Sequence, residues 1–236
     1  MARVLVPLPD RDFDVTEVAV PWRLLTDAGH TVVFATESGA VPAADPRLIT
    51  GVLFGQLGAE AEPIDFYRAM LTDPGYLAPL TWATLDVESF DALLMPGGHA
   101  PGMRQYLGST ELQGRVRDFW ALERPVAAIC HGVLPLARAG VLSGVQTTCL
   151  PKYMERSAFL LTAWRLGRYY RTYPAYVEDE VRASGAHFVR GPRAGTRRGT
   201  AVDDSPAFTV QDGRYLSARW PGDAYLFAKQ LIAMCD

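Results

Sequence analysis

Cys130 is the residue whose place in the sequence points most clearly to chemistry. The short apolar run 126–129 ends directly at this cysteine, and His131 and Gly132 follow before a helical pattern begins. A buried strand that stops at a nucleophile and turns at once into a helix is typical of a nucleophile elbow. The helix N-terminus stabilises a thiolate and lowers its pKa. A buried inert cysteine is the alternative, but the neighbouring histidine and the strand end favour a reactive thiol.

Two glycines, Gly97 and Gly98, follow the apolar run 91–95 and one proline. Glycines after a strand commonly serve only to turn the chain. Here the amides of Gly98 and His131 face the same crevice if the two strands are neighbours, and together they make a two-donor oxyanion hole. His99 comes next and is expected to line the pocket that binds substrate.

Two side chains are candidates to move protons. Glu17 opens the helical pattern after the first apolar run, where its carboxyl would share a proton with Cys130; charge complementarity at a helix N-terminus explains it equally well. The imidazole of His131 needs a third group to orient it, since adjacent side chains on a tight turn diverge. Spacing does not choose among the possible partners, which are Glu155, Asp179 and Glu180. No Cys/His cluster has zinc spacing and no loop has a Walker pattern, so no metal and no cofactor are expected.

Short apolar runs alternate with amphipathic stretches, which predicts an α/β fold with a parallel sheet covered on both faces. Sites in such sheets lie outside the carboxyl ends of the strands. Strands are predicted over 4–7, 31–35, 91–95, 126–129, 186–189, 207–210 and 215–217, and helices over 17–28, 64–71, 151–166, 176–183 and 222–233. Residues 51–80 lack a clear period and are expected to leave the sheet as a partial lid. No internal repeat or boundary divides the chain, so one domain spanning 1–236 is predicted.

The overall charge excludes some classes of protein. A net charge of −3, from 23 basic and 26 acidic residues, does not favour nucleic-acid binding. Three cysteines without paired spacing argue for a reducing compartment, and no apolar run is long enough for a membrane span. A cytoplasmic protein is expected. The arginine-rich stretch 190–199 is interpreted as a solvated loop; the alternative is a lid whose arginines bind an anionic substrate or a neighbouring subunit.

The motifs over 17–21, 96–99 and 128–132, together with the ending 210–221, resemble those of the ThiJ/PfpI superfamily over almost the whole chain. The resemblance implies a flavodoxin-like three-layer sandwich with a mostly parallel central sheet and a cysteine nucleophile elbow, related to class I glutamine amidotransferases. A homodimer is also implied.

The resemblance assigns roles to five residues. Cys130 takes the place of the nucleophile and Glu17 that of the acid hydrogen-bonded to it, while Gly98 and His131 take the oxyanion-hole positions. The sequence is most similar to the heat-shock chaperone and glyoxalase III branch, in which a carboxylate completes a Cys-His-acid triad. Glu155 falls where that acid is expected, although in protease-like members a neighbouring subunit supplies it.

The leading functional expectation is a glutathione-independent glyoxalase that acts on methylglyoxal or a related small carbonyl substrate. One alternative is a cysteine hydrolase or hydratase acting on an amide, peptide, nitrile or isonitrile. Another is a stress chaperone or oxidation sensor in which Glu17 caps a Cys130 sulfinate. The stretches 161–173 and 190–199 depart from the family pattern, so the substrate stays open.

Overall fold

A seven-stranded sheet forms the centre of the computed structural model, which describes residues 1–193, 195 and 197–236. Its strands are β1 (Arg3–Pro7), β3 (Thr31–Thr36), β5 (Leu80–Thr81), β6 (Ala92–Met95), β7 (Val126–Ile129), β10 (Thr209–Asp212) and β11 (Tyr215–Ala218). They lie in the order β10-β11-β7-β6-β1-β3-β5, and every neighbouring pair is parallel except the hairpin of β10 and β11. β1, β6 and β7 are therefore next to one another, and their carboxyl ends meet at one edge.

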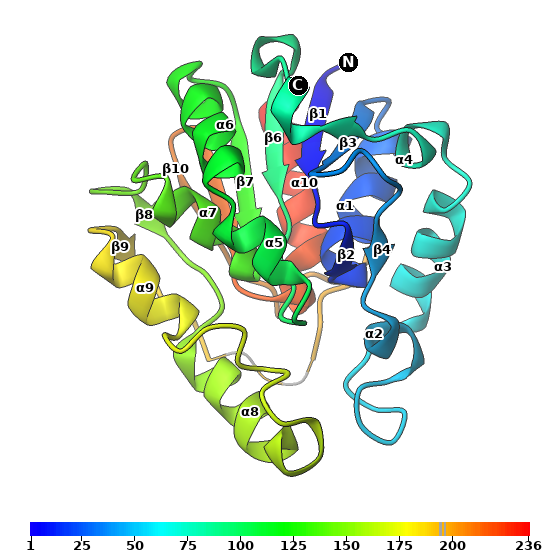
Figure 1. The fold of residues 1–236 in the computed structure, drawn as a ribbon, viewed down its shortest axis with the longest axis vertical. Helices are drawn as coiled ribbons and strands as arrows, with labels where there is room; N and C mark the ends of the chain where they lie inside the picture. The colour runs from blue at the N-terminus through cyan, green and yellow to red at the C-terminus, as the bar shows by residue number, and fades with distance from the viewer. Residues whose placement is uncertain (194, 196) are drawn as a thin grey trace.

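Helices cover both faces of this sheet (Figure 1). On one face α1 (Val15–Asp27) packs against α3 (Ala61–Met70) and α10 (Ala224–Cys235); on the other, α7 (Val133–Arg138) packs against α5 (Met103–Gly108) and α6 (Thr110–Ala121). The predicted three-layer sandwich with a mostly parallel sheet is confirmed. β6 and β7 are buried at every position, as expected of strands covered on both sides.

Smaller elements surround the sandwich. β8 (Gln146–Thr147) and β9 (His187–Phe188) form a separate parallel pair, so the strand predicted over 186–189 exists but lies outside the central sheet. β2 (Arg11–Phe13) pairs with β4 (Ala43–Ala44), and 3-10 turns span Trp82–Thr84, Val87–Ser89, Cys130–Gly132 and Pro221–Asp223. No helix within the described residues is long and apolar enough to cross a membrane.

Two segments connect or flank the main elements. Residues 51–80 contain α3, which packs on α1, and α4 (Pro74–Leu77), which lies against β3, and they follow the short helix α2 (Pro46–Thr50). α8 (Lys152–Leu166) and α9 (Val177–Ala183) form the second segment, and α8 projects at the bottom of Figure 1. Residues 194 and 196 of the arginine-rich stretch lie outside the described residues.

Candidate active site

Cys130 occupies an unusual backbone conformation between β7 and α7. Its φ angle is +58°, in the left-handed region that residues other than glycine seldom adopt. A single 3-10 turn, Cys130–Gly132, joins the strand to the helix. Strain of this kind is found where a surrounding structure holds a functional side chain in place. The backbone therefore has the strand–turn–helix geometry of a nucleophile elbow.

Glycines let the loop after β6 touch this elbow. A Cβ atom added at Gly132 would lie 2.1 Å from the carbonyl oxygen of Met95, and one at Gly97 would lie 2.8 Å from the amide nitrogen of His131. Neither space holds a larger residue. The loop that carries Gly98 therefore lies against the amide of His131. This placement is what the predicted oxyanion hole requires, and the oxyanion hole stays a prediction.

Glu17 is completely buried in the first turn of α1. The helix begins at Val15 because the Asp14 side chain accepts hydrogen bonds from the amides of Thr16 (2.8 Å) and Glu17 (3.1 Å). Oε2 of Glu17 accepts a hydrogen bond from the amide of Gly97 at 2.8 Å, and the carboxyl also interacts with the Cys130 thiol, whereas Oε1 has no N–H or O–H donor among the described residues. An unpaired buried carboxylate oxygen is costly, which favours the protonated carboxyl.

Burial is the main reason why the pKa of Glu17 lies well above its usual value, and the neighbouring Asp14 charge raises it further. The pKa of Cys130 also lies well above its usual value. Burial is the main cause and the charges of Glu17 and Asp14 raise the pKa further, whereas a hydrogen bond from the His131 amide lowers it. The lowered thiol pKa expected from the helix N-terminus is thus not found, because burial of the sulfur, followed by the charges of Glu17 and Asp14, outweighs the His131 amide. Because Glu17 raises the pKa of Cys130, and the hydrogen bond with the thiol in turn lowers the pKa of Glu17, we infer that the two groups titrate as a coupled pair. Each still holds its proton more tightly than it would in water.

The two histidines at the site are neutral. His131 lies with Nδ1 3.5 Å from the Cys130 sulfur, so its side chain reaches the thiol in spite of being the adjacent residue. His99 stacks on the ring of Tyr170, with ring centroids 4.2 Å apart. Burial lowers the pKa of each imidazole to about 3, and Nε2 of each is buried without a hydrogen-bond partner among the described residues. Both rings can therefore hydrogen-bond a ligand as neutral groups.

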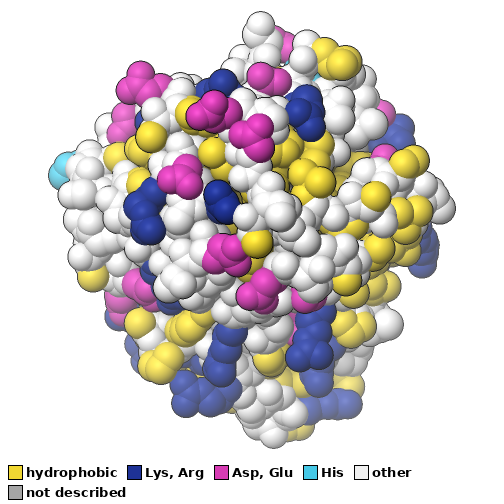
Figure 2. All heavy atoms as spheres, turned by 45° about the horizontal axis from the view of Figure 1, so that its top comes forward, with side chains coloured by type: hydrophobic (Ala, Val, Ile, Leu, Met, Phe, Trp, Pro, Cys, Tyr) yellow, Lys and Arg dark blue, Asp and Glu magenta, His cyan; other side chains and the backbone are white. Residues whose placement is uncertain are grey.

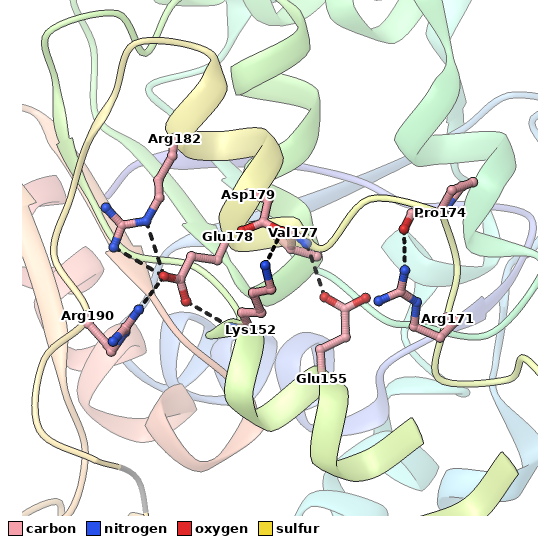
Figure 3. A network of polar contacts seen from close by, with 9 residues as sticks. All are labelled: Lys152, Glu155, Arg171, Pro174, Val177, Glu178, Asp179, Arg182 and Arg190. Carbon is pink, nitrogen blue, oxygen red and sulfur yellow. Dashed lines mark hydrogen bonds and ion pairs between the residues drawn. The ribbon is translucent and has the colours of Figure 1, made fainter. Parts of the chain in front are cut away.

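Glu155 lies on α8 and connects it to the start of α9 (Figure 3). Its Oε2 accepts a hydrogen bond from the amide of Val177 at 3.0 Å. Burial raises the pKa of Glu155 to about 7. Within the described part of the chain no hydrogen bond joins Glu155 to His131, so its place in a triad stays a prediction.

The two other carboxylates considered as partners of His131 are engaged elsewhere. Asp179 accepts from Lys152 at 2.6 Å, and Glu180 pairs with Arg138 at 2.6 Å. Neither side chain lines the pocket that contains Cys130. They serve to hold α8, α9 and α7 together.

A pocket of about 490 Å³ opens above Cys130 and is lined by some of the candidate residues but not by Glu17 or Gly98. Cys130, His131, His99 and Glu155 all line it. Sequence reasoning missed several other lining residues, namely Asp14, Thr16, Tyr153, Tyr170 and Trp220. Asp14 had a usable signal, because an acidic N-cap three residues before Glu17 must lie in the same crevice.

Fold and site together define a class of protein: an α/β sandwich that presents a cysteine on an elbow beside a buried glutamate. Residues 8–192 match the model of the family described as ThiJ/PfpI family-like. The chain belongs to this family, as its motifs indicated.

Similar proteins span nearly the whole chain. An uncharacterized protein of Schizosaccharomyces pombe is 30% identical over 97% of this chain and 82% of its own length. A Pyrococcus abyssi protein named as a deglycase is 25% identical and is covered over 98% of both chains. The crystal structure of glyoxalase III from Candida albicans superposes with a TM-score of 0.70 at 19% identity, over 99% of this chain and 97% of that one.

Proposed function

We propose that this protein is a cofactor-free, cysteine-dependent enzyme, and specifically a glutathione-independent glyoxalase that converts a 2-oxoaldehyde into a 2-hydroxy acid. The observation that carries the proposal is the buried pair of Glu17 and Cys130, of which Cys130 lines a pocket. A carboxyl with a raised pKa next to a thiol is suited to move protons near neutral pH. Family membership supports an enzyme of this kind.

The first step is addition of the Cys130 sulfur to the aldehyde carbon. The step starts from the form of the pair that has lost one proton, in which Oε1 of the Glu17 carboxylate, the oxygen without a partner, accepts the thiol proton as the C–S bond forms. The aldehyde oxygen becomes an oxyanion, which the amides of Gly98 and His131 stabilise. The oxyanion then takes the proton from Glu17, which gives a neutral hemithioacetal and returns Glu17 to the carboxylate.

The second step moves hydrogen between the two substrate carbons. Glu17 or His131 removes the proton from the carbon bonded to sulfur, giving an enediol, and a proton returns to the neighbouring carbon. The former ketone is now a hydroxyl and the former aldehyde is a thioester. Water then hydrolyses the thioester, which releases the 2-hydroxy acid and restores the Cys130 thiol.

A deglycase is the second candidate, favoured by the Pyrococcus abyssi relative. Such an enzyme would act on the adduct that a 2-oxoaldehyde forms with an amine. The Cys130 sulfur would attack the former aldehyde carbon of this adduct. The amine would leave as the C–S bond forms. A preformed adduct of methylglyoxal with an amino acid, freed of unreacted methylglyoxal, separates the two activities.

The test of the proposed function is turnover of methylglyoxal without glutathione, followed as loss of substrate and formation of lactate. We expect turnover by the native protein and none by Cys130→Ser. Cys149→Ser is the matched control, since Cys149 is also buried but does not line the pocket, and it should retain activity. Equal turnover by the Cys130→Ser variant would overturn the proposal.

A further inference from the structure

Positive charge is concentrated in one part of the chain. Residues 152–198 contain 10 Lys and Arg against 4 Asp and Glu, a net charge of +6, whereas the remaining residues contain 13 against 22, a net charge of −9. In Figure 2 the lower edge of the molecule is dominated by Lys and Arg, and most Asp and Glu lie above it. The segment with the excess of positive charge supplies α8 and the arginine-rich stretch, which line the pocket.

The structure separates the arginines of this stretch into two kinds. Arg190 is paired with the buried Glu178 at 2.7 Å, on the side of the molecule shown in Figure 3, and Arg197 is paired with Asp203. These two have carboxylate partners outside the pocket. Arg193 and Arg198, in contrast, line the pocket that contains Cys130.

Arg198 has a long and exposed ion pair. Its side chain is 20% exposed, and it lies 3.8 Å from a carboxylate oxygen of Glu60, whose side chain is itself 70% exposed. One guanidinium nitrogen donates to the carbonyl oxygen of Gly58 at 3.0 Å, which positions the group without neutralising it. The charge of Arg198 also lowers the pKa of Asp14 against the effect of burial, so its field reaches the base of the pocket.

The pocket is larger than a three-carbon oxoaldehyde requires. At about 490 Å³ it falls in the range of sites that bury ligands of drug size, roughly 300–1,000 Å³. Apolar and aromatic side chains, among them Leu161, Tyr170 and Trp220, line it together with the arginines and the reactive residues. A substrate that fills this space has an apolar body and, at the arginines, a group that pairs with a guanidinium.

We propose that Arg198, together with Arg193, binds an anionic group of the substrate, so that the preferred substrate is a 2-oxoaldehyde with an apolar body and a carboxylate or phosphate at its far end. Guanidinium groups suit both anions because they donate two parallel hydrogen bonds. The inference rests on the proposed function for its reactive group and adds the class of substrate to it.

The test compares three substrates that share one reactive group: phenylglyoxal, 4-carboxyphenylglyoxal and the ring bearing a phosphate ester. We expect kcat/KM of the native protein to be at least about tenfold higher for an anionic substrate than for phenylglyoxal, the effect of one charge-assisted hydrogen bond. The anion with the higher kcat/KM identifies the group. Molar salt should reduce the preference.

Variants locate the effect. Arg198→Gln should remove most of the preference by lowering kcat/KM for the anionic substrate much more than for phenylglyoxal. Arg197→Gln is the matched control, because Arg197 is paired with Asp203 and does not line the pocket; it should keep the preference. Equal kcat/KM for all three substrates in the native protein, or an equal loss for all three in Arg198→Gln, would overturn the inference.

A second measurement keeps the inference separate from the proposed function. If no oxoaldehyde is turned over, the rates at which iodoacetate and iodoacetamide alkylate Cys130 are compared, each relative to its rate with free cysteine. If the native protein prefers iodoacetate and this preference disappears in Arg198→Gln, the anion site is supported even though the proposed glyoxalase function has failed. No relative preference for iodoacetate overturns the anion site as well.

Discussion

The base of the pocket and its rim are built in opposite ways. At the base, Cys130 and Glu17 are buried, and glycines let backbone segments touch within the sheet. At the rim, α8 buries only Glu155 and Thr162 among its 15 residues, and the side chains of Leu161 and Trp164 are 68% and 70% exposed. The base is thus fixed by the fold, whereas the rim can change its side chains at little cost in stability. Reaction type belongs to the first region and choice of substrate to the second.

After the loss of Cys130 itself, the largest effect should come from removing the acid beside it. Glu17→Gln keeps the shape and a hydrogen-bonding group but cannot carry a proton, so kcat/KM should fall by roughly 10²–10⁴-fold. Glu111→Gln, at an exposed glutamate in the first turn of α6, is the control and should not change kcat/KM. Turnover by Glu17→Gln within twofold of native would show that Glu17 is only structural.

The close packing at the base should be the next most sensitive feature. Gly132→Ala forces a Cβ to within 2.1 Å of the Met95 carbonyl oxygen, so the unfolding free energy should drop by about 3 kcal/mol through overpacking of backbone against backbone. Gly114→Ala in α6 has no contact closer than 3.9 Å and should gain about 0.5–1 kcal/mol. Denaturant titration of both variants measures this. An equal effect of the two substitutions would mean that the elbow tolerates displacement.

Asp14 gives a prediction about pH. Burial raises its pKa from 3.8 to about 6, so its contribution to stability is fully present below pH 4 and is lost as the pH rises through 6. Asp14→Asn keeps the cap and removes the buried charge; the unfolding free energy at pH 8 should rise by about 1–3 kcal/mol, with little change at pH 4. The exposed cap Asp86→Asn should show no such pH dependence. A lower unfolding free energy for Asp14→Asn than for the native protein at pH 8 would contradict a raised pKa of Asp14.

The smallest effects on stability should come from the rim. Leu161→Ser exposes no new core, so the unfolding free energy should stay within about 0.5 kcal/mol of native. KM should rise several-fold while kcat is kept, because the side chain lines the pocket away from the reacting atoms. Steady-state kinetics with phenylglyoxal checks this. A fall in kcat with KM unchanged would place Leu161 with the base and remove the distinction between the two regions.

The same distinction explains what the sequence could predict. The sheet, its main helices and the association of Cys130 with Glu17 follow from apolar runs and from motifs that the fold requires. The raised pKa of Cys130 did not follow, because it depends on burial and then on the charges of Glu17 and Asp14, which no local pattern expresses. The sequence also did not predict that Arg190 pairs closely with Glu178 while Arg198 lies farther from Glu60. Tertiary packing brings these glutamates near the arginines.

The most direct test of the central claim is the pH profile of Cys130 alkylation by iodoacetamide in the native protein and in Glu17→Gln. A coupled pair loses its two protons in two macroscopic steps, so the native profile should show two steps and the variant a single one. Identical single-step profiles in the two proteins would show that Cys130 titrates independently of Glu17 and would contradict the account.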